Sequence, residues 1–248
     1  MKILLASDMQ TGDNFGYTVS LSGDMLVVGA PYEDGGAGDP TPDAGAVYLF
    51  ARDQGGADNW GEVKILHASD KQADDLFGHA VSLTSNMLAV GAPWEKGGVG
   101  DPLDYAGAVY IFARDQGGMN NWGQLKTLHA SNLGTWDQFG YSVALGSELL
   151  VAGAPTKAVS VNSGATYVFV RNEGGINNWG EAKILLASDI QAGDYFGWSI
   201  AFDSDTLAAG APFEDGGEGD PVGGAGAAYV FDLVMPTVAP LAVNISGP

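Results

Sequence analysis

Hydrophobic residues in this chain fall into short runs that glycine, aspartate, asparagine and proline separate. In Phe77–Leu83 apolar and polar residues alternate, which predicts a β-strand buried on one face. Met87–Ala92 and Ala108–Phe112 are almost continuously apolar, as is typical of strands covered on both faces. Gln124–His129 is a further run of strand length. The pattern therefore predicts a unit of four strands.

The segments between these runs have lengths that suit antiparallel strands. Thr84–Asn86 is short enough for a hairpin between the first two strands. Arg114–Gly123 is a longer loop between the third strand and the fourth, and Glu62–His67, which precedes the unit, has the pattern of another fourth strand. No apolar run approaches the roughly 20 residues that span a bilayer. An all-β protein with many turns is expected.

The unit is repeated along the chain. A Phe-Gly pair occurs in four places, and Gly-Ala-Pro begins fourteen positions after each of these phenylalanines. Four matched pairs in one frame indicate four copies of one structural unit. The residues of the two motifs are Phe15, Gly16, Gly29, Pro31, Phe77, Gly78, Gly91, Pro93, Phe139, Gly140, Gly153, Pro155, Phe196, Gly197, Gly210 and Pro212.

Four copies of a four-stranded antiparallel unit predict a β-propeller of four blades. The chain begins with Lys2–Leu5, which matches the fourth strands at Lys64–His67, Lys126–His129 and Lys183–Leu186. Its last copy ends on the third strand, Ala227–Phe231. We therefore expect the N-terminal strand to supply the missing strand of the last blade and so to remove an exposed edge.

The repeats divide the chain into a propeller at residues 1–233 and a tail at residues 234–248. The copies cover about residues 9–70, 71–132, 133–189 and 190–233, the last completed by residues 1–8. The tail contains three prolines and no repeat motif, so it is expected to be a linker or tail, and the chain to be a fragment of a larger multidomain protein.

Composition narrows the range of partners. The net charge of −20 argues against nucleic-acid binding, which needs clustered lysine and arginine, and no membrane insertion is expected. The chain has no cysteine, so disulfides and thiol chemistry are excluded. A strongly acidic surface attracts cations, and it also promotes solubility.

The repeat motifs resemble a known family. Phe-Gly at the start of one strand, Gly-Ala-Pro at the end of the next and Gly-Ala-Val-Tyr in the third, at Gly45–Tyr48 and Gly107–Tyr110, resemble the FG-GAP repeats of integrin α-subunit propellers. The Asn-Trp-Gly and Ala-Ser-Asp segments make the chain still more similar to bacterial secreted FG-GAP proteins. The resemblance covers about residues 2–233 and implies a propeller that mediates adhesion.

Acidic residues are expected to gather on one face of the propeller. Because blade strands alternate in direction, the loops between second and third strands emerge beside the loops that lead into the next copy. We call this side the acidic face. Carboxylates and glycines in such loops suit Ca²⁺, although a solvated polar loop is the competing interpretation. The candidate ligands are Glu33, Asp34, Asp39, Glu95, Asp101, Glu214, Asp215 and Asp220 in the first kind of loop and Asp8, Asp13, Asp70, Asp75, Asp189 and Asp194 in the second.

Two departures limit what the resemblance implies about metal. Integrin-type repeats that bind calcium carry an Asp-x-Asp-x-Asp-Gly loop between the Phe-Gly and Gly-Ala-Pro strands, whereas here that turn is as short as Ser22–Asp24. Those calcium sites therefore cannot be carried over. In the third copy the loop that should hold acidic ligands is the shortened Thr156–Ser163, which has no carboxylate.

Aromatic and histidine positions give no support for catalysis. Trp60, Trp122 and Trp179 recur at the start of fourth strands and are expected to cover blade edges. The residue after each Phe-Gly pair is aromatic, which fits a size requirement or, as a minority interpretation, a ligand-lining role; these residues are Tyr17, His79, Tyr141 and Trp198. His67 and His129 replace leucines of the other copies, so a ligand or base is not expected there.

No catalytic residue is assigned, and an enzyme is not expected. The sequence favours a secreted or cell-surface adhesion scaffold that binds an unidentified protein or glycan ligand, with divalent cations ordering its acidic face. One alternative is a lectin-like propeller that binds carbohydrate through exposed aromatic residues. Another is a glycosidase-like hydrolase that uses paired carboxylates.

Overall fold

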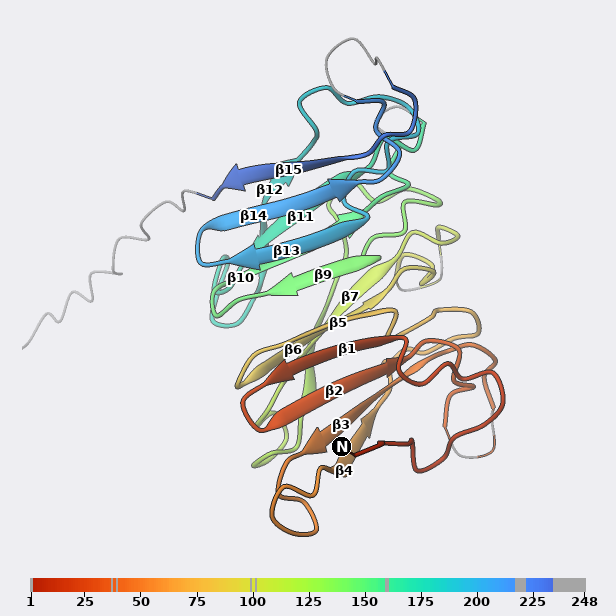
Figure 1. Cartoon of the computed structure of the whole chain (residues 1–248), viewed down its shortest axis with the longest axis vertical. Coiled ribbons are helices and arrows are strands. Elements are labelled where there is room, and N and C mark those ends of the chain that lie inside the picture. Colours follow the sequence, from red (N-terminus) through yellow and green to blue (C-terminus); the bar gives the residue numbers. More distant parts are fainter. Residues whose placement is uncertain are drawn as a thin grey trace, which may run out of the picture.

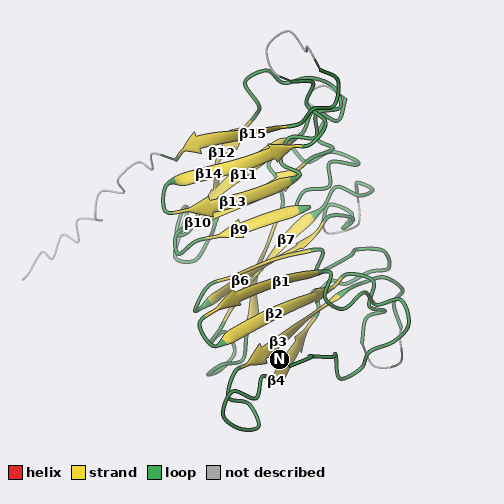
Figure 2. Cartoon of the chain, viewed as in Figure 1, coloured by secondary structure: helices red, strands yellow, loops and turns green. Residues whose placement is uncertain are grey.

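The computed structural model consists of antiparallel sheets stacked along the longest axis of the molecule, with the first copy at one end and the last copy at the other (Figure 1). It describes residues 2–36, 38, 40–98, 100, 102–158, 161–216 and 222–233. Within these ranges all regular structure is strand, and the connections are turns and loops (Figure 2). No helix that could cross a membrane is found among these residues. The predicted tail at residues 234–248 lies outside them.

Each copy of the repeat forms one sheet, in which neighbours in sequence are neighbours in space. The pairing is antiparallel throughout. The first three sheets have four strands, and the last has three among the described residues. The strands are β1 (Thr18–Ser22), β2 (Met25–Ala30), β3 (Ala46–Ala51) and β4 (Gly61–Leu66); β5 (Ala80–Leu83), β6 (Met87–Ala92), β7 (Ala108–Ala113) and β8 (Gly123–Leu128); β9 (Ser142–Leu145), β10 (Leu149–Ala154), β11 (Ala165–Val170) and β12 (Gly180–Leu185); and β13 (Ser199–Asp203), β14 (Thr206–Ala211) and β15 (Ala227–Asp232).

The burial of the strands agrees with their hydrophobic patterns. All of β6 and β10 is buried, and so are all but the last residues of β7 and β11, because neighbouring sheets cover both faces of these continuously apolar strands. The outer strands end on a buried leucine but are otherwise partly exposed. Trp122 and Trp179, just before β8 and β12, are fully buried, which confirms that they serve as packing residues.

The phenylalanines of the Phe-Gly pairs fill the space between sheets. Phe77 lies edge-on against Tyr110 and Phe112 of its own sheet, at ring-centroid distances of 5.3 and 5.9 Å. It belongs to a buried cluster that also contains Val47 and Leu49 of the preceding sheet. Phe139 and Phe196 are buried in the same manner. Phe15 is only partly buried, because no described sheet precedes its own.

Two repeated glycines explain why the motifs recur. A Cβ atom on Gly91 of Gly-Ala-Pro would lie 1.9 Å from the carbonyl oxygen of Gly140, in the Phe-Gly pair of the next sheet. The corresponding distance from Gly29 to the oxygen of Gly78 is 2.1 Å. Backbones of adjacent sheets therefore approach each other where only glycine fits. The two motifs form one contact between blades.

The N-terminal segment does not close the last sheet, contrary to the sequence-based prediction. Lys2 Nζ donates hydrogen bonds to Asn59 Oδ1 (2.5 Å) and to the carbonyl oxygen of Trp60 (2.7 Å), so the segment lies against the first sheet. Lys64 and Lys126 of complete outer strands reach the matching asparagines of the next sheet in the same way. The segment thus lies where the outer strand of a preceding blade would be. The last sheet is at the far end of the stack (Figure 1).

Candidate functional site

An aromatic row crosses all four sheets on the acidic face. It consists of the residues that follow the Phe-Gly pairs, which lie just before β1, β5, β9 and β13. Because these strands lie side by side, residues about sixty positions apart in sequence come into contact. The ring centroids are 5.1 Å apart for Tyr17 and His79, 4.7 Å for Tyr141 and Trp198, and 4.5 Å for the middle pair, His79 and Tyr141.

Hydrogen bonds fix the tautomer of the central histidine. His79 Nδ1 lies 3.1 Å from the carbonyl oxygen of Tyr141, which can only accept, so Nδ1 carries the proton. Nε2 then accepts a hydrogen bond from the Tyr17 hydroxyl at 3.2 Å. Burial lowers the pKa of His79, which keeps the imidazole neutral at pH 7. Burial also raises the pKa of Tyr17 and raises that of Tyr141 to about 12. The row is therefore uncharged.

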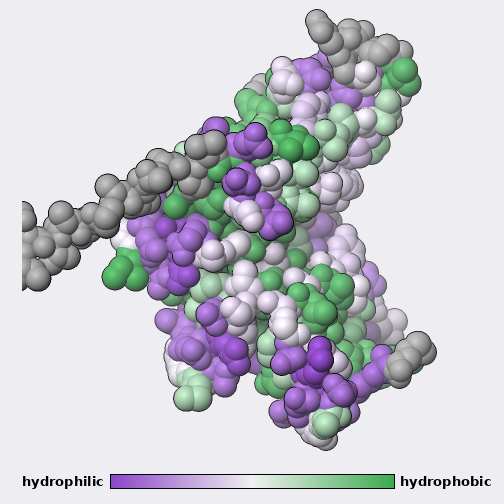
Figure 3. Space-filling model, turned by 60° about the vertical axis from the view of Figure 1, so that its left-hand side comes forward, coloured by the Kyte–Doolittle hydropathy of each residue, from purple (hydrophilic) through white to green (hydrophobic). Residues whose placement is uncertain are grey.

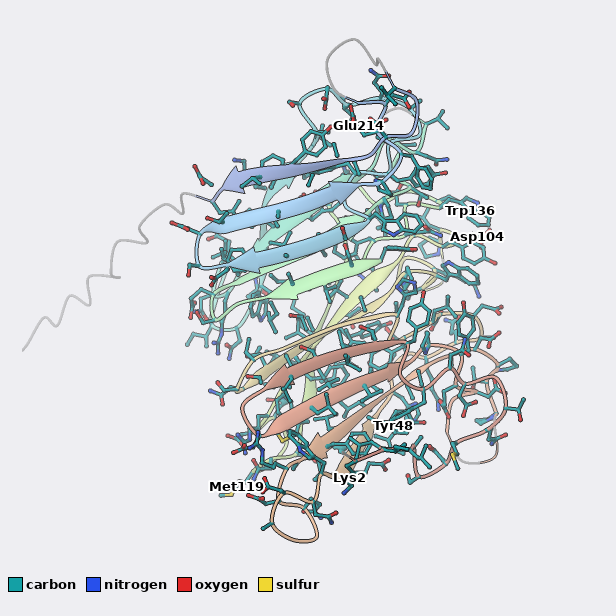
Figure 4. The ribbon with its side chains drawn as sticks, in the orientation of Figure 1. Lys2, Tyr48, Asp104, Met119, Trp136 and Glu214 are labelled. Carbon is teal, nitrogen blue, oxygen red and sulfur yellow. The ribbon has the colours of Figure 1, made fainter. Side chains whose placement is uncertain are left out.

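Further rings widen this surface. Tyr32 and Phe213, which directly follow Gly-Ala-Pro, lie 6.4 Å from Tyr17 and 6.2 Å from Trp198 respectively, between ring centroids. In the middle of the face Tyr105 stacks on Trp136 at 4.1 Å, and Trp136 is 55% exposed. The labelled Trp136 and Asp104 lie together on the side to which these loops project (Figure 4). The third copy has Thr156 where the other three have an aromatic residue.

The glutamates predicted as metal ligands accept hydrogen bonds from backbone amides. Glu33 is buried and accepts hydrogen bonds from the N–H groups of Gly35 and Gly36 at 2.9 and 2.7 Å. Glu214 is also buried and accepts one from Gly216 at 2.8 Å. In these copies the glycine-rich loop folds around its own carboxylate.

Glu95 makes the same contacts with Gly97 and Gly98, at 2.8 and 2.7 Å. His129 Nε2 lies 3.3 Å from its carboxylate. Burial alone would raise the pKa of Glu95, but the hydrogen bonds from His129 and the two amides hold it below its ordinary value. His67 stands 3.8 Å from Glu33 in the first copy. Both histidines thus stand beside the carboxylate that holds the loop. The sequence did not predict this role, because leucine occupies the same position in the other copies.

The buried aspartates of the loops between copies also bind backbone. Asp13, Asp75 and Asp194 each accept a hydrogen bond from the N–H group three residues earlier, at 2.6 to 2.7 Å. Burial raises the pKa of Asp75 to about 7 and raises that of Asp194, despite these hydrogen bonds. In the third copy Asp137 forms an ion pair of 2.6 Å with Lys157.

The remaining candidate ligands are spread along the face. Asp8 and Asp189 accept hydrogen bonds from the hydroxyls of Tyr48 and Tyr229, at 2.8 and 2.6 Å. Asp34 and Asp215 accept from backbone N–H groups within their own loops. Asp70 precedes Asp75 in the loop that follows β4. The other three candidates, Asp39, Asp101 and Asp220, lie outside the described residues.

The structure does not gather the described candidate ligands into one metal centre. No group of three or more histidine, aspartate or glutamate side chains able to hold a metal ion is found within the described ranges. The candidates are divided among the loops of the first, second and fourth sheets, and most of those that are described accept hydrogen bonds from backbone amides. Calcium binding stays a prediction.

The model of the FG-GAP repeat matches residues 1–50, 60–112, 122–169 and 179–231, which is most of the chain. The chain belongs to the FG-GAP repeat family. Among solved structures, the Pan2 WD40 domain of Neurospora crassa is similar, with a TM-score of 0.44 and 14% identity over 88% of this chain and 62% of that one. No curated protein matches.

On the opposite face of this FG-GAP propeller, described residues line at least two open hollows. One of about 550 Å³ lies between the turns of the first two copies and contains Arg52, which pairs with Asp24 at 3.1 Å. Another of about 530 Å³ is lined by Gly146–Leu149 and by Phe202. In the space-filling view hydrophobic residues reach the surface among hydrophilic ones (Figure 3). Neither hollow continues across all the sheets, so the aromatic row is the better candidate for a binding surface.

Proposed function

We propose that this FG-GAP propeller is a non-catalytic scaffold that binds a partner protein on its acidic face. The observation that carries the proposal is the aromatic row, a line of ring contacts that crosses all four sheets. Aromatic residues are enriched where proteins bind each other, because they offer a large area and lose little conformational entropy. The carboxylates around the row accept hydrogen bonds within their own loops. We therefore assign them a structural role in holding the row in place, and no catalytic role.

The chemistry of the face favours a positively charged partner segment. The chain carries a net charge of −20, and much of its acidic content is in loops beside the row. Exposed Tyr17 and Trp198 offer ring faces to which guanidinium groups bind by cation–π contacts. The surrounding negative charge would speed association with such a segment. We therefore expect an arginine-rich stretch of another protein, bound outside the cell or at its surface as the resemblance to secreted propellers suggests.

A titration with a labelled peptide of alternating arginine and glycine tests this proposal. Replacing Tyr17 and Trp198 together by alanine is expected to weaken binding roughly tenfold, because each exposed cation–π contact contributes about 0.5–1 kcal/mol. The measurement is fluorescence anisotropy at fixed ionic strength, with EDTA and with millimolar CaCl₂. The two additions also show whether a divalent cation takes part.

Met119→Ala with Ile176→Ala is the matched control. Both residues are exposed apolar side chains in loops of the opposite face. Neither the control nor the row variant changes the net charge. Equal affinities of the two double variants would mean that peptide binding depends on the overall charge of the protein alone. The proposed binding surface would then be wrong.

A carbohydrate ligand is the second candidate, and the same row favours it. Sugar rings stack on exposed aromatic side chains, and carboxylates accept hydrogen bonds from sugar hydroxyls. Binding of a neutral glycan should change little with salt, whereas binding of a cationic segment should weaken steeply as salt screens the charges. A glycan array identifies any glycan that binds. A salt series on the binding of that glycan then distinguishes a carbohydrate ligand from a cationic protein segment.

A further inference from the structure

The two ends of the stack present the two halves of one interface. At the far end, Val230 of β15 is 68% exposed, whereas Ile111, at the same position of β7, is fully buried by the next sheet. At the near end, Val19 of β1 is 63% exposed, whereas Val81 of β5 is 8% exposed beneath the preceding sheet. Each end therefore exposes residues that the interfaces within the chain bury.

The edge of β15 has no strand beside it among the described residues. In the complete sheets an outer strand pairs with β3, β7 or β11. An unpaired edge exposes backbone N–H and C=O groups that can pair with another strand. The free edge of β15 is therefore the position at which a fourth, outer strand would pair.

Residues 2–8 have the sequence of that outer strand. They are Lys-Ile-Leu-Leu-Ala-Ser-Asp, which is identical to residues 183–189, whose first three residues end β12. They also occupy an outer-strand position: Ser7 hydrogen-bonds Glu62 as Ser131 hydrogen-bonds Glu181. They pair with no described strand, and Ile3 is 75% exposed. Among the described residues, the segment therefore has the sequence and the position of an outer strand but no sheet to pair with.

We infer that copies of this chain associate head to tail, with residues 2–8 of one copy completing the last sheet of a second copy. β1 of the first copy then covers β14 and β15 of the second, as β5 covers β2 and β3 within the chain. The pairing of β11 with β12 sets the register, in which Leu185 faces Thr166 and Ile184 faces Tyr167. By this register Leu4 faces Ala228 of the second copy, and Ile3 faces Tyr229.

The second copy is favoured over closure within one chain by the separation of the two ends. The N-terminal segment and β15 lie at opposite ends of the longest axis (Figure 1). An interface between unlike surfaces closes into a ring when its rotation permits. Two copies would join twice the four sheets of one chain, within the range of about four to eight blades usual for propellers.

Engineered cysteines test the register directly, because the native chain has no cysteine. Leu4→Cys and Ala228→Cys are made in separate full-length chains, mixed and oxidised. The expected product is a disulfide-linked pair of about twice 25.5 kDa on a non-reducing gel. Light scattering of the native protein should give the same doubled mass. Ile3→Cys mixed with Ala228→Cys is the matched control, since side chains one residue apart point to opposite faces of a strand.

Three results would overturn the inference. One is a monomer mass at every concentration together with no mixed disulfide. Another is equal cross-linking by the Leu4 and Ile3 variants, which would indicate random collision. The last is a chain carrying both Leu4→Cys and Ala228→Cys that forms only an internal disulfide, which would show that the propeller closes on itself.

Discussion

Replacing Phe139 by alanine is expected to lower the free energy of unfolding by about 3–5 kcal/mol, as for other fully buried phenylalanines. The ring lies between sheets, 5.3 Å from Tyr167 and 5.8 Å from Phe169, and within the cluster that contains Val109 and Ile111 of the preceding sheet. Its removal leaves a cavity that backbone on both sides prevents from closing. Urea denaturation followed by circular dichroism measures the loss.

Phe15→Ala is the control for this experiment, because Phe15 has the same motif position but no described sheet before it. In dilute monomer its replacement should cost clearly less. The cost should rise with protein concentration when copies associate head to tail, since Phe15 would then be covered. Equal losses for the two variants in monomer would contradict the packing of Phe139 between blades.

Gly91→Ala is expected to prevent folding or to cost more than about 4 kcal/mol, an exceptional loss that overpacking against fixed backbone can cause. The new methyl group would stand 1.9 Å from the carbonyl oxygen of Gly140, a backbone atom in the turn just before β9, where the Gly140 N–H donates a hydrogen bond to the carbonyl oxygen of Gly153. Neither sheet can shift alone, because each also contacts a further neighbour. Thermal unfolding of the purified variant, or its yield in the soluble fraction, measures the effect.

Gly210→Ala provides the matched control in the last copy. The nearest atom to its new methyl group is Ser199 Oγ at 2.5 Å, which belongs to a side chain that can rotate away. The cost in dilute monomer should be about 1 kcal/mol. A similar loss from Gly91→Ala and Gly210→Ala would mean that the close approach of blades is not what requires glycine.

The strands could be predicted closely from hydrophobic pattern. Met87–Ala92 has the bounds of β6, and Ala108–Phe112 is one residue shorter than β7. The strand predicted at Phe77–Leu83 begins later, at Ala80. Gly78 has a φ of 93°, so the chain turns at the Phe-Gly pair before it extends. A turn buried between sheets has the same apolar sequence as a strand, which is why the pattern could not separate them.

Spatial relations between copies were harder to predict. The sequence identifies residues 2–5 as an outer strand, but it does not say which sheet the strand lies against. That depends on the rotation between sheets, and the hydrogen bond from Lys2 to Asn59 shows that the segment lies against the first sheet. The aromatic row was likewise visible only as a repeated aromatic position. Stacking of Tyr17, His79 and Tyr141 requires the first strands to lie side by side.

The carboxylates illustrate the same limit for the site. Their concentration in glycine-rich loops was evident from sequence, and oxygen ligands for Ca²⁺ were a reasonable expectation. The glycines, however, supply N–H groups as well as flexibility. Glu33 and Glu95 are bound by those groups within their own loops. Sequence composition could not show which donors would reach each carboxylate.

Amide hydrogen exchange, measured with and without the arginine–glycine peptide, locates the binding surface most directly. Binding on the acidic face should slow exchange around the aromatic row, in residues 14–17, 76–79, 138–141 and 195–198. Exchange in the loops of the opposite face, at residues 114–122 and 171–179, should not change. Slowed exchange confined to those opposite loops, or none along the row at saturating peptide, would contradict the proposed function.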